Sequence, residues 1–171
     1  EIRFEQLLKV VDTEKRFTIS DLGCGYGYLF EYLSKKTNNF YYFGYDISEE
    51  MIKKAKELYK RHHNRRFIIN NKINEYSDYS VASGIFNVRL YFEDEVWIDY
   101  ILNVLNDLNN MSRKGFSFNC LTKYSDKEYM RDYLYYANPT MIFEYCKKNF
   151  SKNVALLHDY DLYEFTIIVR K

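Results

Sequence analysis

The stretch Phe17-Thr-Ile-Ser-Asp-Leu-Gly-Cys-Gly-Tyr-Gly27 decides the fold of this 171-residue chain. Its first five residues combine β-branched and apolar side chains and stop at a glycine-rich turn, which predicts a β-strand. After the third glycine, apolar side chains at positions 28, 29, 32 and 33 follow the spacing of a helix. Glycine lets the backbone turn sharply and approach a ligand closely. The stretch therefore predicts a strand, a ligand-binding loop and a helix.

The rest of the chain repeats this alternation of strands and helices. Helices are expected over residues 4–11, from 28, from 49, over 96–108 and over 139–150, and strands over 17–21, 40–45, 67–69, 79–83, 114–121, 154–157 and 164–169. Such an order predicts an α/β fold, a Rossmann-like three-layer sandwich with a mostly parallel seven-stranded sheet and an antiparallel edge hairpin. No linker or repeat interrupts the pattern, so residues 1–171 are expected to form a single domain.

The glycine loop is typical of a nucleotide-binding site, but its neighbours disfavour a dinucleotide. In the G-x-G-x-x-G frame the third glycine position is occupied by Tyr28, whose bulk would obstruct close helix packing. Asp21, directly before the loop, would repel a pyrophosphate but would suit a cationic ammonium or sulfonium. No G-x-x-x-x-G-K-[ST] phosphate loop is present. The ligand is therefore expected to carry positive charge.

The segment Ile19–Gly27 resembles motif I of the class I S-adenosylmethionine-dependent methyltransferases. This resemblance implies S-adenosyl-L-methionine as cofactor. It also implies that the loop residues Gly23, Cys24, Gly25 and Gly27 pack on the methionine part, and that Asp21 orients its amino group. The resemblance extends over nearly the whole chain. The chain is also similar to a group of small bacterial methyltransferases.

Three further segments match the family at the ends of later strands. By this resemblance Asp46 accepts hydrogen bonds from both ribose hydroxyls, and Ile47 packs on the adenine. An aspartate that only caps the next helix is the alternative, although Ser48 is better placed for that cap. Asn71 replaces the usual acid that contacts the adenine amino group, and a loop asparagine without a ligand is an equal alternative. Ser83, after the fourth strand, is expected to contact the methionine part.

Methyl transfer from a sulfonium depends mainly on alignment of the reacting atoms, so neither a metal nor a protein nucleophile is expected. The acceptor pocket is expected at Gly84, Phe86 and Tyr160. His158 is the candidate general base, because it follows a strand that ends on the ligand side of the sheet. Asp159 or Glu164 could orient its ring. A histidine that is merely solvated, or that pins the hairpin, is the favoured alternative.

The composition limits which class of methyl acceptor and which cellular compartment are expected. The net charge of +1 provides no field that would attract nucleic acid or an anionic membrane. The basic run 60–66 is interpreted as the solvated end of a helix. Three widely spaced cysteines suggest neither disulfides nor zinc, and no membrane span is present, so a cytoplasmic protein is expected. A small-molecule acceptor is therefore predicted, with an RNA methyltransferase and a non-catalytic cofactor-binding partner protein as alternatives.

Overall fold

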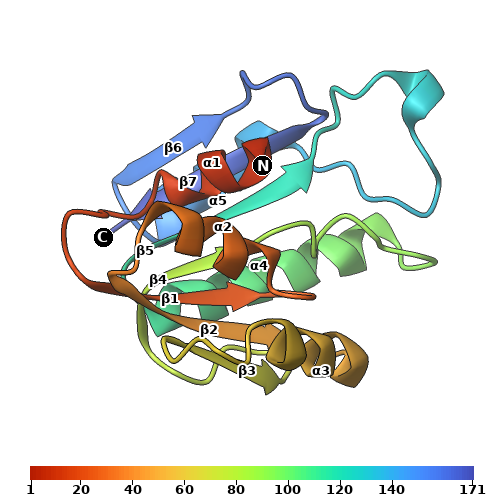
Figure 1. Cartoon of the computed structure of the whole chain (residues 1–171). Helices are drawn as coiled ribbons and strands as arrows, with labels where there is room; N and C mark the ends of the chain where they lie inside the picture. The colour runs from red at the N-terminus through yellow and green to blue at the C-terminus, as the bar shows by residue number, and fades with distance from the viewer.

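The computed structural model describes residues 1–171 and is built around one seven-stranded sheet with the strand order β3-β2-β1-β4-β5-β7-β6 (Figure 1). The strands from β1 to β5 pair in parallel, whereas β7 pairs antiparallel with both β5 and β6. The strands are β1 (Phe17–Leu22), β2 (Phe40–Asp46), β3 (Arg65–Ile69), β4 (Ser77–Ala82), β5 (Ser112–Leu121), β6 (Asn153–Leu157) and β7 (Glu164–Arg170).

Helices cover both faces of this sheet. Leu7, Phe30 and Ile52, from the first three helices, join one apolar cluster on one face, and Ile101 and Ile142, from the last two, join a second cluster on the other. Figure 1 shows the resulting three layers, with α1 lying over β5 and β7. The helices are α1 (Ile2–Leu8), α2 (Tyr28–Lys36), α3 (Glu49–Leu58), α4 (Asp94–Met111) and α5 (Pro139–Asn149), with a short 3-10 turn η1 (Lys127–Tyr129).

This architecture confirms the predicted Rossmann-like sandwich, and the expected elements agree with the observed ones to within a few residues. The hairpin lies at the edge as expected, and its antiparallel strand β7 sits between β5 and β6. The strand β6 consequently runs in the same direction as β1 to β5. The first residue of β7, Glu164, therefore faces Leu121 at the carboxyl end of β5.

The strand order reverses between β1 and β4, and this reversal fixes the position of a ligand site. In open α/β sheets the connections leave in opposite directions at such a point, and a crevice opens beyond the carboxyl ends of the two strands. Leu22 and Ala82 are paired at that edge. The glycine loop after β1 and the Ser83-Gly84 turn after β4 therefore lie side by side.

The basic run after α3 has a structural role. Nε and Nη2 of Arg65 donate to the Tyr59 carbonyl, at 3.0 and 2.8 Å, where the last carbonyls of α3 lack helical partners. Arg66 pairs with Glu75 at 3.0 Å. The run therefore follows the end of α3 and contacts its last carbonyls, but it is not itself helical, and Arg65 and Arg66 already belong to β3. None of the helices combines the length and the apolarity that a membrane span requires.

Phe30 is the most connected ring of the face that supports the glycine loop. Its fully buried side chain packs against the rings of Phe40, Tyr42, Tyr59 and Phe67. We expect Phe30→Ala to lower the free energy of unfolding by about 3–5 kcal/mol, because the cavity it leaves cannot be filled by neighbouring side chains.

Tyr91→Ala provides the control for this measurement by chemical denaturation. Tyr91 is 96% exposed, so its removal should change the free energy of unfolding by less than about 0.5 kcal/mol. Equal effects of the two substitutions would contradict the assignment of Phe30 to the core.

Candidate functional site

The glycine loop turns back on the end of β2. Gly23, Gly25 and Gly27 all have positive φ angles, of 78, 52 and 85 degrees, which glycine adopts without strain. The N–H groups of Gly23 and Cys24 donate to the Tyr45 carbonyl at 2.8 and 2.9 Å, and that of Gly27 donates to the Cys24 carbonyl at 2.9 Å. Because these donors are already used, the loop is not a cradle for a phosphate group.

Asp46 clamps this loop from the end of β2. One carboxylate oxygen accepts from the N–H of Gly25 at 2.8 Å, and the other accepts from the N–H of Ser48 at 2.9 Å. The Ser48 hydroxyl accepts from the N–H of Met51 at 3.2 Å and so caps α3. Ser48 therefore fills the capping role that was the alternative for Asp46. Each Asp46 oxygen keeps a lone pair for a further donor.

A cavity of about 380 Å³ lies between this clamp and the end of β4. Six of the expected site residues line it, namely Gly23, Asp46, Ile47, Asn71, Ser83 and Gly84, together with Leu22, Asn70, Ile85 and Tyr100. The Ile47 side chain is 75% exposed and presents an apolar face. A methyl group added at Gly25 would meet no atom within 4 Å, so space is open above the loop.

Asp21 lies below the loop in a site that is almost closed to solvent. Only 3% of the residue is exposed, and the Tyr42 hydroxyl donates to its carboxylate at 2.6 Å. Burial raises the pKa of the Asp21 carboxyl to about 7 and the negative charge of Asp46 adds to this, whereas the Tyr42 hydrogen bond opposes it. A cationic group bound nearby would offset the cost of ionising this carboxyl.

Two expected loop contacts point away from the cavity. The Cys24 side chain is buried in the apolar cluster under the loop, so only its backbone faces outward. At Gly27 a Cβ atom would lie 2.9 Å from both Phe67 and Tyr59, so glycine is needed there for packing on the neighbouring rings. Gly27 thus allows the loop to pack closely on the Phe67 and Tyr59 rings below it.

A second cavity of about 430 Å³ shares Ser83 with the first and is bordered by residues of α1 and α2. Its lining combines aromatic rings with charged groups, namely Glu1, Arg3, Phe4, Tyr28, Glu31, Tyr32, Lys35 and Ser83. Glu31 and Lys35 form their own ion pair at 2.7 Å. Ser83 therefore lies where two spaces of small-molecule size meet.

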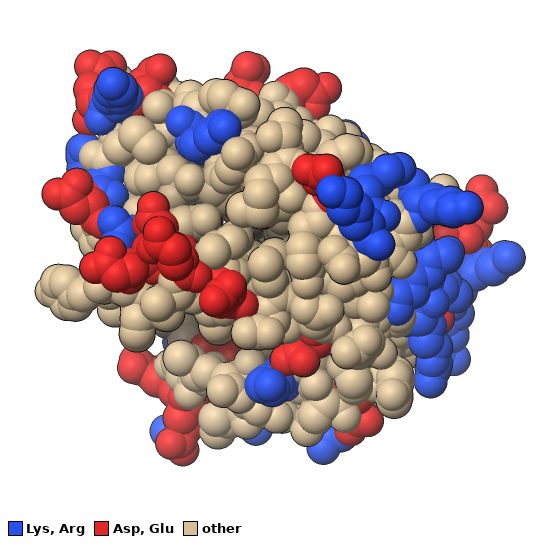
Figure 2. Space-filling view, turned by 180° about the vertical axis from the view of Figure 1, so that it is seen from behind, with Lys and Arg blue, Asp and Glu red and all other residues tan.

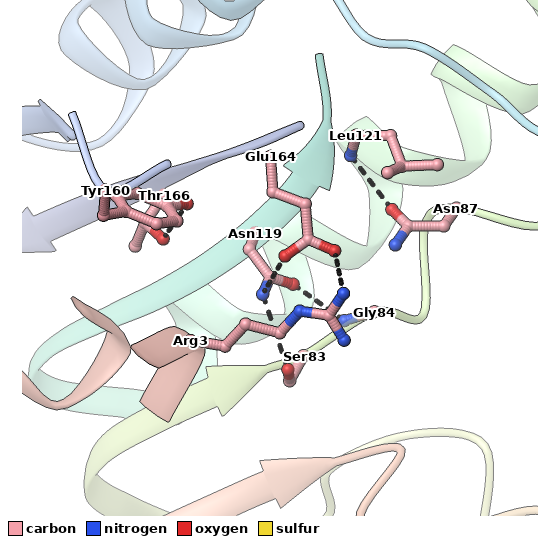
Figure 3. Close-up of polar contacts among 9 residues, drawn as sticks. All are labelled: Arg3, Ser83, Gly84, Asn87, Asn119, Leu121, Tyr160, Glu164 and Thr166. Carbon is pink, nitrogen blue, oxygen red and sulfur yellow. Dashed lines mark hydrogen bonds and ion pairs between the residues drawn. The ribbon is translucent and has the colours of Figure 1, made fainter. Parts of the chain in front are cut away.

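A polar cluster lies beside Ser83 on the sheet face under α1 (Figure 3). Glu164 is 2% exposed, and its carboxylate pairs with the Arg3 guanidinium at 2.7 Å and accepts from the Asn119 amide at 3.3 Å. The Asn119 oxygen accepts from the N–H of Gly84 at 2.7 Å, and its amide nitrogen donates to the Ser83 hydroxyl at 3.5 Å. Burial raises the pKa of the Glu164 carboxyl, and Arg3 opposes that rise.

The remaining expected site residues lie outside both cavities. His158 is exposed and packs beside the rings of Tyr124 and Phe165, while Glu164 is engaged by Arg3 and does not orient it. The Phe86 ring is completely buried against Phe118, so it forms part of the core under the β4 turn and does not line an acceptor pocket.

Tyr160 also lies outside both cavities. It is 9% exposed, and its hydroxyl forms a hydrogen bond of 2.9 Å with the Thr166 hydroxyl. Burial raises the pKa of the Tyr160 hydroxyl to about 12. This phenol therefore stays protonated at neutral pH, and its hydrogen-bond partner is Thr166, so the pair is separate from the contacts among Arg3, Glu164, Asn119 and Ser83 (Figure 3).

For several residues of the site, no clear sequence pattern predicted a functional role. Arg3 comes from the first helix, Asn119 from the middle of an apolar strand and Tyr100 from α4. Only Asn119 stood out as a polar residue inside an apolar run, which is a pattern of buried polar groups. The meeting of Arg3 and Glu164 depends on the docking of α1, which no local pattern specifies.

Comparison with known proteins identifies the family. A family model described as "Methyltransferase domain" matches residues 19–115. The Mycobacterium tuberculosis protein named "Putative methyltransferase Rv1506c" is 52% identical over 164 residues, which are 96% of this chain and 99% of the relative. The chain belongs to the class I S-adenosylmethionine-dependent methyltransferases. The predicted resemblance based on Ile19–Gly27 is confirmed.

Solved methyltransferases share the fold of this methyltransferase at low identity. A SAM-dependent methyltransferase from Aquifex aeolicus superposes with a TM-score of 0.67 at 18% identity, over 98% of this chain and 92% of that one. The N-methyltransferase NodS from Bradyrhizobium japonicum, in complex with S-adenosyl-l-homocysteine, gives 0.67 at 14% identity, over 99% and 85% of the two chains. Human N-acetylserotonin methyltransferase gives 0.71 at 13% identity, and this chain spans about half (51%) of its length.

The residues around the first cavity of this methyltransferase fit the family's cofactor. Open space above Gly25 leaves room for a ligand to lie on the backbone, and an exposed Ile47 face suits a flat base. Asp46 offers free lone pairs to a diol, and the buried Asp21 suits a cation. The donors, shape and charge of the site therefore match S-adenosyl-L-methionine.

Tyr42→Phe tests the coupling between Tyr42 and Asp21. The folded-state pKa of Asp21 is raised above the ordinary 3.8, so its contribution to stability is present below pH 3.8 and is lost as the pH rises toward about 7. Without the Tyr42 hydrogen bond the folded pKa rises further and the loss continues to higher pH. We expect the variant to lose about 1 kcal/mol of unfolding free energy near pH 5 and about 2–3 kcal/mol near pH 8.5.

Tyr79→Phe is the matched control in the same denaturation series. Tyr79 is also buried, but its hydroxyl accepts only from the backbone N–H of Asp12 at 3.2 Å. The unfolding free energy that Tyr79→Phe loses should therefore be independent of pH. If Tyr42→Phe also loses the same unfolding free energy at both pH values, the raised pKa of Asp21 is contradicted.

Proposed function

We propose that this methyltransferase transfers a methyl group from S-adenosylmethionine to a small-molecule acceptor by in-line displacement. The observation that supports the proposal most strongly is the junction at Ser83. On one side lies the cavity bounded by Asp46 and the open glycine loop, and on the other lies a second cavity lined with aromatic rings. A donor and an acceptor bound in adjoining spaces can be aligned for displacement.

Each part of the first cavity offers a partner for one part of the cofactor. Asp46 would accept from the ribose hydroxyls, Ile47 and Asn71 would border the adenine, and the Gly23 backbone, with the open space above Gly25, would border the methionine chain. Asp21 would balance the positive charge of the amino group. When bound, the cofactor supplies an activated sulfonium methyl group, so the protein needs mainly to position the acceptor and exclude water.

The size and charge of the molecule favour a small acceptor over a nucleic acid. The second cavity, of about 430 Å³, falls within the range of small-molecule sites and has Phe4, Tyr28 and Tyr32 in its wall. On the face shown in Figure 2, lysine and arginine side chains gather along one margin, whereas acidic and basic side chains are mixed along the other. No continuous basic track crosses that face, as a single-stranded RNA would require.

Isothermal titration with S-adenosylhomocysteine tests the cofactor site. We expect the wild-type chain to bind in the micromolar range and Asp46→Ala to bind about 100-fold more weakly, because the variant loses hydrogen bonds to a charged group that contribute roughly 3 kcal/mol. Asp107→Ala is the control, because this carboxylate pairs with Lys72 on the surface and lines neither cavity. Its affinity should equal that of the wild-type chain.

Two outcomes would contradict the proposed cofactor site. The wild-type chain could fail to bind the nucleoside, or Asp46→Ala could bind as tightly as Asp107→Ala. Thermal unfolding of both variants should be recorded beside the titrations, since Asp46 also holds the N–H of Gly25. If Asp46→Ala unfolds cooperatively near the Tm of the wild-type chain, and the ligand raises the Tm of the wild-type chain and of Asp107→Ala but not that of Asp46→Ala, the variant has lost binding and not folding.

A further inference from the structure

The buried carboxylate of Glu164 is a charged group next to the second cavity that cofactor binding leaves unused. We propose that Glu164 is the acceptor-binding residue of this enzyme, that it receives the ammonium group of an arylalkyl amine, and that Arg3 occupies its place in the free protein. This inference rests on the proposed methyl transfer and names the chemical class of the acceptor.

The position of Glu164 connects it with the methyl-transfer junction. Asn119 donates to Glu164 at 3.3 Å and to the Ser83 hydroxyl at 3.5 Å, and it accepts from the Gly84 N–H at 2.7 Å. Ser83 belongs to both cavities. One side chain thus ties the carboxylate to the strand end where donor and acceptor would meet.

Arg3 separates Glu164 from the second cavity. Figure 3 shows its side chain reaching from α1 to the carboxylate, with Ser83 and Asn119 beside it. Arg3 lines the cavity and is 51% exposed, whereas Glu164 is 2% exposed. A rotation of this half-exposed side chain would open the carboxylate to the cavity. The guanidinium lies 2.7 Å from Oε1 of Glu164, so the carboxylate is already paired with a cation, while this buried oxygen still lacks a hydrogen-bond donor.

The ion pair is not needed to hold α1 on the sheet. Leu7 is completely buried, the Leu7 carbonyl accepts from the Ser117 hydroxyl at 2.8 Å, and the Lys9 carbonyl accepts from Arg170 at 2.6 Å. A buried ion pair is often no more stabilising than apolar side chains of the same volume. The burial of a carboxylate at the ligand edge of the sheet therefore fits a binding role better than a scaffolding role.

The walls of the cavity indicate the remainder of the acceptor. The rings of Phe4, Tyr28 and Tyr32 line it among charged side chains, so an aromatic body attached to the amine would pack against these three rings. A positive charge is also attracted to the faces of such rings. In an aryl group joined to a primary amine by a short alkyl chain, the aryl group can pack on the rings while the ammonium group pairs with the carboxylate.

Glu164 can also handle the proton that must leave before attack. The ammonium gives one proton to the carboxylate, and the neutral nitrogen then forms a bond to the methyl carbon while the methyl–sulfur bond breaks and its electron pair stays on sulfur. The product leaves as a methylated ammonium ion, and Glu164 returns its proton to water. The raised pKa of the Glu164 carboxyl suits it to this role.

Benzylamine and benzyl alcohol are suitable probes for the experiment. Benzylamine binding to the S-adenosylhomocysteine complex is followed by NMR, and methyl transfer from labelled S-adenosylmethionine is measured with both compounds. Three variants are compared with the wild-type chain, namely Glu164→Gln, Arg3→Ala and the control Glu5→Gln. Glu5 lies on the same helix and outside both cavities, and its substitution by glutamine removes a charge but keeps an oxygen that can accept from the Tyr32 hydroxyl, now at 3.0 Å.

We expect Glu164→Gln to abolish benzylamine binding and to slow its methylation about 100-fold, with nucleoside affinity unchanged. Arg3→Ala should bind the amine several-fold more tightly, because its competitor is gone. Glu5→Gln should behave as the wild-type chain, and benzyl alcohol should be methylated far more slowly than the amine.

Three results would overturn the proposal. Glu164→Gln and Arg3→Ala could lose amine binding equally, which would make the ion pair a structural anchor only. A second such result is that benzylamine binds neither to the wild-type chain nor to Arg3→Ala. A third is that benzyl alcohol is methylated faster than benzylamine. Failure of the cofactor site itself would appear separately, as a loss of nucleoside binding by the wild-type chain.

Discussion

The hydrogen bond from the Tyr42 hydroxyl to the Asp21 carboxylate is the contact on which the site depends. It joins the carboxyl end of β1 to the neighbouring strand β2 in a region closed to solvent. The Tyr42 ring is fixed by Phe30 from α2 and by Phe67 from β3, so the acid is held by several elements at once. A buried carboxyl requires such support, because burial without a partner costs several kcal/mol.

The glycine loop follows from the same constraint. Directly after Asp21 the chain has to leave the sheet, turn over the buried acid and enter α2, and Gly23, Gly25 and Gly27 provide the positive φ angles for this path. Asp46 fastens the loop from the adjacent strand end through the Gly25 N–H. Two carboxylates of different character thus lie at this loop: Asp21 is buried below it with a raised pKa, and Asp46, which lines the cavity, is held by two backbone donors.

Sequence patterns predicted the fold and the cofactor side of the site because both are encoded locally. The strand, glycine loop and helix at residues 17–36 follow one another in the chain. Asp46 is the last residue of β2 and Ser83 directly follows β4, two strands whose carboxyl ends share an edge. The acceptor side was harder to predict, since Arg3, Asn119 and Glu164 come from distant segments and meet only when α1 docks on β5 and β7. His158 follows β6 as expected, but β6 is the outermost strand, so this histidine lies away from Ser83. Phe86 was misplaced because an aromatic residue after a strand can face a pocket or the core, and periodicity does not distinguish these positions.

If the end of β1 receives the positively charged amino group of the cofactor, as proposed, cofactor binding must change the titration of Asp21. Carboxyl ¹³C NMR of aspartate-labelled protein, with the Asp21 signal assigned by Asp21→Asn, measures this pKa with and without saturating S-adenosylhomocysteine. The account predicts a pKa of about 7 in the free protein and a fall of roughly 1–3 units on binding, because an ammonium nearby favours the carboxylate. An ordinary pKa in the free protein, or one that the nucleoside leaves unchanged, would contradict it.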